Sequence, residues 1–362
     1  MWWEFRQWRR QWLNWALFAL GFAVILGSYV YASNQAQQAN AREYDTLLAE
    51  SQQLADADKN LADQTQTEKV TKQRAAIQRE QTIISRYGRA LTGHRRNLLS
   101  HRLAYYRLLQ HPAFPFSQRS ATVIHQAITR DRYLQQHELV PRENVSALTP
   151  AAAFGRSQNA AVFLLILSLL VLQFGGLFAR DWETGSIRLL LMLPQERQRL
   201  SRHKLGLALV IAGSELVLWS VFGYLLAAIR SGQRWGGAYP WRAVGTRIVT
   251  LNSVLLTNML TIILVSTLVI VLLYWLSILL RDQFTVIVAM IAVLGSGALF
   301  FGEASTNLLA ALNPFYQLGL STHVGLRNVL VYGTLMGITD TALILAALVG
   351  GHFWWRKSTN LV

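Results

Sequence analysis

The chain has 362 residues, of which 52% are hydrophobic, and it carries 34 Lys or Arg against 19 Asp or Glu, for a net charge of +15. Several stretches of about 20 residues are almost free of charge, which is the length that crosses roughly 30 Å of hydrocarbon, so an integral membrane protein is predicted. The basic excess fits anionic lipid head groups beside such spans, and no nucleic acid partner is expected. The absence of cysteine excludes disulfides, thiolate metal sites and thiol catalysis.

Residues 1–32 are expected to hold an N-terminal segment and the first span. Three arginines precede an apolar run from Trp12 to Ala32. Val30 and Ala32 loosely resemble a signal-peptide cleavage site, but the run is longer than the roughly 7–15 apolar residues usual in such peptides. Five tryptophans among the first 15 residues are typical of an interfacial aromatic belt, so an uncleaved first span is predicted.

Residues 33–157 are predicted to form a helical extracytoplasmic domain. Apolar residues spaced by seven occur there in two series: Leu47, Leu54 and Leu61, then Val70, Ile77, Ile84 and Leu91. This spacing favours a long helix or a helical hairpin with a narrow packed stripe over a strong coiled coil. A further helix is predicted over 95–109, before Pro112 and Pro115. The spacing of the domain's five histidines is more typical of solvated side chains than of a metal site.

Five further spans are predicted after this domain. They are residues 158–179, 205–229, 249–280, 284–301 and 329–355. The connections between them, in chain order, are a charged segment at 180–204, a Gly- and aromatic-rich turn region at 230–248, the short break 281–283 and an external amphipathic re-entrant segment at 304–328. A tail at 356–362 follows the last span. With the N-terminus inside, the short inner segments hold 12 Lys or Arg and the short outer loops hold 5. This bias follows the positive-inside rule. The predicted fold is therefore an all-α membrane protein with six transmembrane helices and both termini in the cytoplasm.

Few ionisable side chains lie inside the predicted spans: Asp340 is in the sixth and Glu215 is in the third. With Glu215, the amides Asn252 and Asn258 of the fourth span make three candidate pathway residues. Polar groups in a span normally face the bundle interior or a cavity. These three therefore either line a translocation pathway or make structural interhelical hydrogen bonds, of which the second is the commoner.

The sequence has no signature of an ATP or metal site. No lysine follows a glycine, so the P-loop that would cradle phosphates is missing, and the HExxH pattern is also missing. We therefore expect no cofactor and no metal in this chain.

The charged segment 180–204 differs from an ordinary loop. A helix is predicted from Trp182 to Leu193, with acidic residues first, a face of aliphatic side chains, and Pro194 at its end. Such a helix would lie flat in the inner interface. The segment is either a basic cytoplasmic loop or a docking helix for a cytoplasmic partner.

The stretch RDWETGSIRLLLMLPQERQRLSRHKLGLALV resembles the segment after the second span in ABC-2 type permeases, the membrane subunits of one class of ATP-binding-cassette transporter. LSILLRDQFTVIVAMIAVL is similar to the inner turn between their fourth and fifth spans, and LNPFYQL to an element before their last span. The resemblance covers about 160–355. The long polar domain is similar to that of a bacterial subgroup with a large first external loop.

The resemblance implies a six-span, type V exporter-like permease in the bacterial inner membrane, paired with a second copy or a paralogue. A separate cytoplasmic ATPase subunit would bind ATP and Mg, so this chain would not itself be an enzyme. The residues implied in coupling to that ATPase are Trp182, Glu183, Gly185, Ile187, Arg188, Leu190, Leu191 and Pro194.

Two other classes of protein remain open from the residues alone. The chain could be a membrane sensor or scaffold whose external helices bind a peptide, an envelope protein or an antibiotic. A secondary transporter would need more charge within the membrane and detectable internal repeats, and neither is evident.

Overall fold

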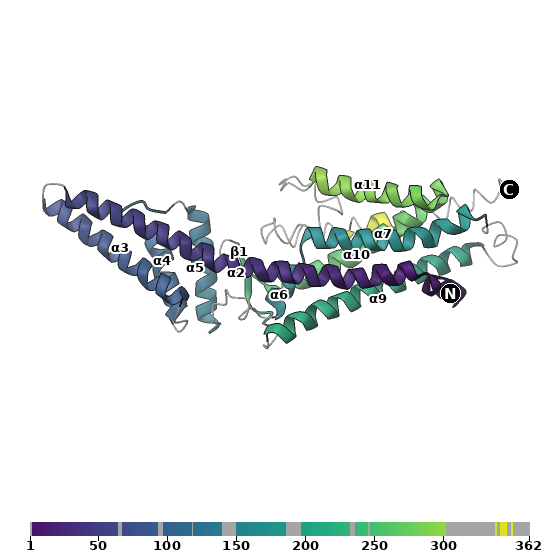
Figure 1. The fold of residues 1–362 in the computed structure, drawn as a ribbon, viewed down its shortest axis with the longest axis horizontal. Helices are drawn as coiled ribbons and strands as arrows, with labels where there is room; N and C mark the ends of the chain where they lie inside the picture. Colours follow the sequence, from purple (N-terminus) through teal and green to yellow (C-terminus); the bar gives the residue numbers. More distant parts are fainter. Residues whose placement is uncertain are drawn as a thin grey trace. The chain divides into compact units, whose positions relative to one another are not determined.

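The computed structural model describes residues 2–63, 67–92, 97–117, 119–139, 150–185, 197–231, 236–244 and 247–301, with short pieces at 337–338, 341–345 and 349. The chain divides into two compact units, each with a hydrophobic core of its own (Figure 1). Unit 1 comprises Met1–Val30, Phe154–Ala227 and Val254–Val362, and unit 2 comprises Tyr31–Ala153 and Ala228–Ser253. Helix α2 (Trp12–Ala62) contributes residues to both units, so the predicted boundary at residue 33 falls inside a helix.

Unit 1 is a bundle of long apolar helices. It contains α1 (Trp2–Arg10), the first part of α2, α7 (Ala160–Glu183), most of α9 (Arg197–Ser231), most of α10 (Leu251–Leu280) and α11 (Gln283–Phe301). The short helix α6 (Pro150–Ser157) lies at the boundary between the units along the chain. Asn159 caps the N-terminus of α7, because its side chain accepts a hydrogen bond from the Val162 N–H at 3.0 Å.

Four helical stretches are long and apolar enough to cross a membrane. They are Trp12–Gln35, Ala161–Glu183, His203–Ile229 and Leu251–Leu280. These four correspond to the first four predicted spans. The fifth predicted span, 284–301, coincides with α11, whose apolar stretch Gln283–Ser296 is shorter. The predicted external segment 304–328, most of the predicted sixth span 329–355 and the tail 356–362 lie outside the described residues.

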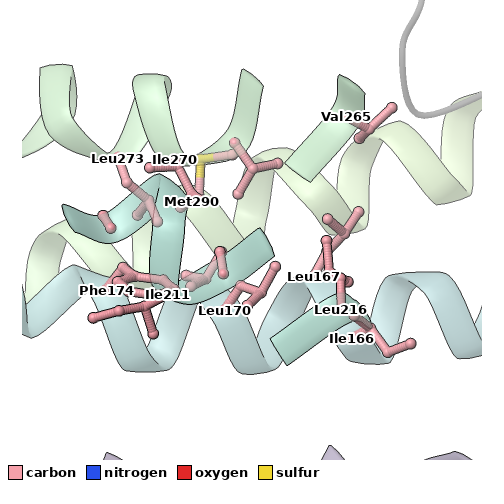
Figure 2. Packing of buried hydrophobic residues seen from close by; sticks show 14 of the residues in the cluster. Ile166, Leu167, Leu170, Phe174, Ile211, Leu216, Val265, Ile270, Leu273 and Met290 are labelled. Carbon is pink, nitrogen blue, oxygen red and sulfur yellow. The ribbon is translucent and has the colours of Figure 1, made fainter. Parts of the chain in front are cut away.

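The core of unit 1 is formed where α7, α9, α10 and α11 meet. Figure 2 shows Phe174 of α7 and Ile211 of α9 close to Leu273 of α10, with Met290 of α11 in the same cluster. These side chains are buried, Phe174, Leu273 and Met290 completely. Aliphatic and aromatic side chains thus fill the interior of the bundle.

Helices α7 and α11 approach each other closely at two glycines. A Cβ atom added to Gly175 would lie 2.6 Å from Ile287 Cγ1, and one added to Gly176 would lie 2.9 Å from Gln283 Nε2. Real Cβ contacts are longer than this, so a side chain at position 175 would force the branched Ile287 to move, whereas at position 176 the flexible end of Gln283 can shift. Small residues at such crossings are typical of helix packing in membranes.

Unit 2 is built on a helical hairpin. The second part of α2 packs antiparallel to α3 (Glu68–Thr92), because Asp58 pairs with Arg74 near the turn and Glu43 accepts from the Tyr87 hydroxyl further along. All but one residue of the two predicted heptad series lie in this core or beside it: Leu47, Leu54, Ile77 and Ile84 are at most 2% exposed, and Leu61 and Leu91 pack against them. The exception is Val70, which is half-buried and does not belong to this cluster. The predicted hairpin with a narrow stripe is therefore the observed arrangement.

Two more helices and a strand pair complete unit 2. The helices are α4 (Leu98–Gln110) and α5 (Ala121–Gln136), and the antiparallel strands are β1 (Pro240–Val244) and β2 (Arg247–Thr250), which pack against α5. The prolines follow the end of α4, as predicted. The mostly helical structure agrees with the predicted all-α membrane protein, and the strand pair departs from the turn region predicted at 230–248. The Trp, Val, Ile and Thr residues of this segment suit a strand, and the strand pair packs against α5.

A buried polar network joins α2 to the segment between α4 and α5. Arg119 lies 3.2 Å from Glu43 and 3.8 Å from Glu50, and its guanidinium stands over the rings of Tyr105 and Tyr106. The Tyr105 hydroxyl donates to Glu50 Oε2 at 2.5 Å. Burial raises the pKa of both tyrosines, so they remain neutral and act as hydrogen-bond donors or acceptors.

Candidate functional site

The end of α7 carries the first of the residues implied in coupling. Trp182 and Glu183 belong to its last turn. Thr184 caps the helix, because its N–H and its hydroxyl both donate hydrogen bonds to the Arg180 carbonyl. The next residue, Gly185, has a positive φ of +68°. This left-handed conformation after a helix end favours glycine. The predicted continuous helix from Trp182 to Leu193 is therefore wrong at Thr184–Gly185, and the predicted end of the second span at residue 179 falls within α7.

The other residues implied in coupling lie outside the described part of the chain. These are Ile187, Arg188, Leu190, Leu191 and Pro194. The chain is described again from Arg197, where α9 begins, so the basic stretch before the third predicted span is already helical.

Three segments that are far apart in the sequence meet around the end of α7. Asp181 forms an ion pair with Lys204 near the start of α9, and both side chains are less than 15% exposed. The Arg281 guanidinium, between α10 and α11, lies 5.3 Å from the centroid of the Trp182 ring. A cation over an indole face is attracted by the ring quadrupole. We call Asp181, Trp182, Lys204, Arg281 and Asp282 the α7-end cluster.

The turn between α10 and α11 positions two members of this cluster. Arg281 ends α10 in the left-handed region, at φ +57°, with its N–H donating to the Ser277 carbonyl at 3.1 Å. A non-glycine residue costs roughly 1–2 kcal/mol in this conformation. The contact between Arg281 and Trp182 offsets part of that cost, which explains why an arginine can occupy a position that suits glycine.

Asp282 caps the start of α11. Its Oδ2 accepts from the Thr285 N–H at 2.7 Å and from the Thr285 hydroxyl. Hydrogen bonds to the carboxylate, first the one from the Thr285 hydroxyl, lower the pKa of Asp282 below its ordinary value. The carboxylate form therefore stabilises the two-residue turn.

This cap predicts a pH-dependent stability of the first turn of α11. Because the folded-state pKa of Asp282 is lower than the unfolded one, its contribution is present at neutral pH and is lost as the pH falls through the folded value. Amide hydrogen exchange near Thr285, corrected for intrinsic rates, should increase on acidification in the wild type. Asp282→Asn keeps an acceptor without a titrating group and should not show this increase. An identical pH profile in both proteins would contradict the role of the carboxylate.

The three polar residues of the predicted pathway have separate partners. Glu215 is 2% exposed, and its Oε1 accepts from Gln173 Nε2 of α7 at 2.7 Å. Asn258 is 6% exposed and donates to Gln158 Oε1 at 3.3 Å. Asn252 belongs to unit 2, where its N–H donates to the Gly237 carbonyl and its side chain packs against Gly237. Glu215 thus makes the interhelical type of contact, and Asn258 binds the connection between α6 and α7. Asn252 supports the connection from the strands to α10.

Sequence reasoning missed four partners at these positions: Gln173, Lys204, Arg281 and Asp282 as a cap. The Asp-x-x-Thr spacing from Asp282 to Thr285 was a usable capping signal. Gln173 is a single amide in an apolar run, and this isolation indicates a buried polar contact as much as it does for Glu215. Nothing in the sequence indicated that Arg281 and Lys204 meet the end of α7, because those contacts depend on how three helices pack.

The apolar helices and the polar cluster at the end of one of them define a multi-pass helical membrane protein. Residues 1–342 match the family described as ABC-2 family transporter protein, so the chain belongs to that family. Neither a search of curated proteins nor a search of solved structures finds a match. The family match confirms the resemblance to ABC-2 permeases, extends it to the N-terminus across residues 33–157, and favours a transport component over a sensor or scaffold.

Proposed function

We propose that this chain is the permease subunit of an ABC exporter in a bacterial inner membrane. A separate ATPase subunit would bind ATP and Mg and supply the energy for translocation. The observation that supports this most is the α7-end cluster. It joins the C-terminal end of α7 to the N-terminal part of α9 and to the turn between α10 and α11. Family membership makes an ATPase partner the general expectation.

The cluster gives the proposed coupling a physical route. A docked ATPase would push on Trp182, Glu183 and the segment that follows Gly185. Because Asp181 is paired with Lys204, displacement of α7 would also exert force on the start of α9. Because the Trp182 ring contacts the Arg281 guanidinium, the same displacement would exert force on the turn before α11. Closure of the ATPase dimer would thereby tilt several spans at once and change access to the pathway.

The proposed topology places this cluster on the cytoplasmic side, with both termini. It assigns residues 33–157 to the extracytoplasmic side. A second permease copy or a paralogue would complete the pathway, and lipid head groups would neutralise the basic residues that flank the spans. No nucleic acid partner is proposed.

Glu183 provides the direct test. It is exposed at the end of α7, so Glu183→Ala should leave folding intact and weaken the ATPase contact. We expect about a tenfold loss of affinity, which corresponds to about 1.4 kcal/mol. Binding of the purified chain to its ATPase partner, and ATPase turnover of the complex, would be measured.

The matched control is Asp45→Ala, which removes an exposed carboxylate from α2 in unit 2. Both variants should elute as folded protein, and only Glu183→Ala should bind the ATPase less tightly. Unchanged affinity and turnover for Glu183→Ala, or equal losses for both variants, would remove Glu183 from the proposed interface.

A further inference from the structure

Two oxygen atoms without a donor belong to one hydrogen-bonded pair of side chains in the interior of unit 1. Glu215 of α9 and Gln173 of α7 are each 2% exposed, and one hydrogen bond of 2.7 Å joins Gln173 Nε2 to Glu215 Oε1. Among the described residues, nothing donates to Glu215 Oε2 or to Gln173 Oε1. A buried acceptor without a partner is costly, so this pair lacks a donor.

Both members of the pair have apolar neighbours along their helices. Leu170 and Phe174 flank Gln173 on α7, and Ile211 and Leu216 flank Glu215 on α9, all within one buried cluster (Figure 2). Glu215 lies 11 residues from Lys204 and 14 from Ile229, which is roughly 16 Å and 21 Å along the helix. It is therefore near the middle of its span, far from the charged ends.

Within the helices that the structure describes, no basic residue lies at the depth of this carboxylate. In the sequence, residues 12–35 of α2, 161–179 of α7, 205–229 of α9 and all of α10 and α11 contain no Lys, Arg or His. Their only titratable side chains besides Glu215 are tyrosines, and residues 329–351 add one further acid, Asp340, and no base. Lys204 is already paired with Asp181. An isolated ionised carboxylate in such surroundings is strongly disfavoured.

We propose that Glu215 is a proton-binding site and forms a neutral acid–amide pair with Gln173. The proton resides on Oε2, so that O–H donates to Gln173 Oε1 while Gln173 Nε2 donates to Glu215 Oε1. One proton, taken from water, accounts for both missing donors: Glu215 Oε2 becomes a hydroxyl oxygen, and its O–H donates to Gln173 Oε1. The resulting ring of two hydrogen bonds fastens α7 to α9.

The chemistry makes this fastening dependent on the proton. Removal of the proton would leave the two oxygens facing each other as acceptors, with repulsion in place of a hydrogen bond. The helix whose attachment to α9 would weaken is α7, whose last turn carries Trp182 and Glu183. Any conformational change that admits water to Glu215 would therefore weaken the α7–α9 contact. This inference does not depend on the proposed ATPase interface.

Infrared spectroscopy of the purified full-length chain in lipid bilayers at neutral pH tests the proposal. The difference spectrum between wild type and Glu215→Gln should contain the carbonyl band of a protonated carboxylic acid, shifted in deuterated water. Gln173→Leu removes the partner, so the same band should remain and move to higher frequency. Asp340→Asn is the matched control for the second acid and should leave the Glu215 band in place.

Two results would overturn the proposal. A difference spectrum that contains only carboxylate bands would show that Glu215 is ionised and that water supplies the missing donor. Failure of Glu215→Gln to fold would also contradict it, since an amide can replace a neutral acid in a ring of two hydrogen bonds but cannot replace a carboxylate.

Discussion

Replacement of Asp131 by alanine should lower the free energy of unfolding of unit 2 by about 3–5 kcal/mol, the cost of leaving one member of a buried ion pair without its partner. Arg102 of α4 donates to both carboxylate oxygens of Asp131 on α5, at 2.7 and 2.6 Å. Their side chains are 1% and 0% exposed. Domains are stable by roughly 5–15 kcal/mol, so this change removes a large part of the total. Amide hydrogen exchange in α4 and α5 of the full chain would measure the loss.

Two control variants separate the ion pair from other effects. Arg130→Ala removes a second, 35% exposed arginine near Asp131, and should cost no more than about 1 kcal/mol. The double variant Arg102→Met, Asp131→Leu replaces both charges by apolar groups and should recover most of the stability. If the double variant is as unstable as Asp131→Ala, the loss is due to packing and not to an unpaired charge.

Replacement of Gly21 by alanine should destabilise the contact between α2 and α9 by about 1–3 kcal/mol, the usual cost of overpacking. A Cβ at this position would lie 2.2 Å from Cε2 of Trp219, whose ring is 1% exposed. The ring has little room to move, because its Nε1 donates to the Phe18 carbonyl at 3.1 Å and its face stacks on the Phe18 ring. The fraction of monodisperse protein that survives heating in detergent would measure the effect.

Gly27 is the matched control on the same helix. An added Cβ there meets none of the described residues within 4 Å. Gly27→Ala should therefore be neutral, or stabilise α2 by up to about 1 kcal/mol through helix propensity. Equal losses for the two alanine variants would show that helix flexibility, and not contact with Trp219, makes glycine necessary at position 21.

Regular patterns made much of this fold predictable. Charge-free runs of about 20 residues identified the spans, because hydrocarbon imposes that length whatever the neighbours. The seven-residue spacing of Leu47, Leu54, Ile77 and Ile84 identified the stripe that α2 and α3 bury. Both patterns are local in the sequence, so they can be recognised without knowing the tertiary contacts.

The features that the sequence could not reveal depend on contacts between distant segments. Thr184 and Gly185 have low helix propensity, but whether the chain stops there depends on the packing of α7. The strand pair β1–β2 is stabilised by α5, more than 100 residues away, and α5 was itself not predicted. Arg281 looked like one charge in a short inner turn, and only the packed structure brings it to Trp182.

The close approach of α7 and α11 has a mechanical consequence. With Gly175 against Ile287, rotation of either helix about its own axis would drive Ile287 side-chain atoms toward the α7 backbone. This contact therefore favours joint movement of the two helices during a rearrangement of the bundle. Contacts made by flexible side chains, such as the one between Ser220 of α9 and Met259 of α10, can adjust more easily when helices shift.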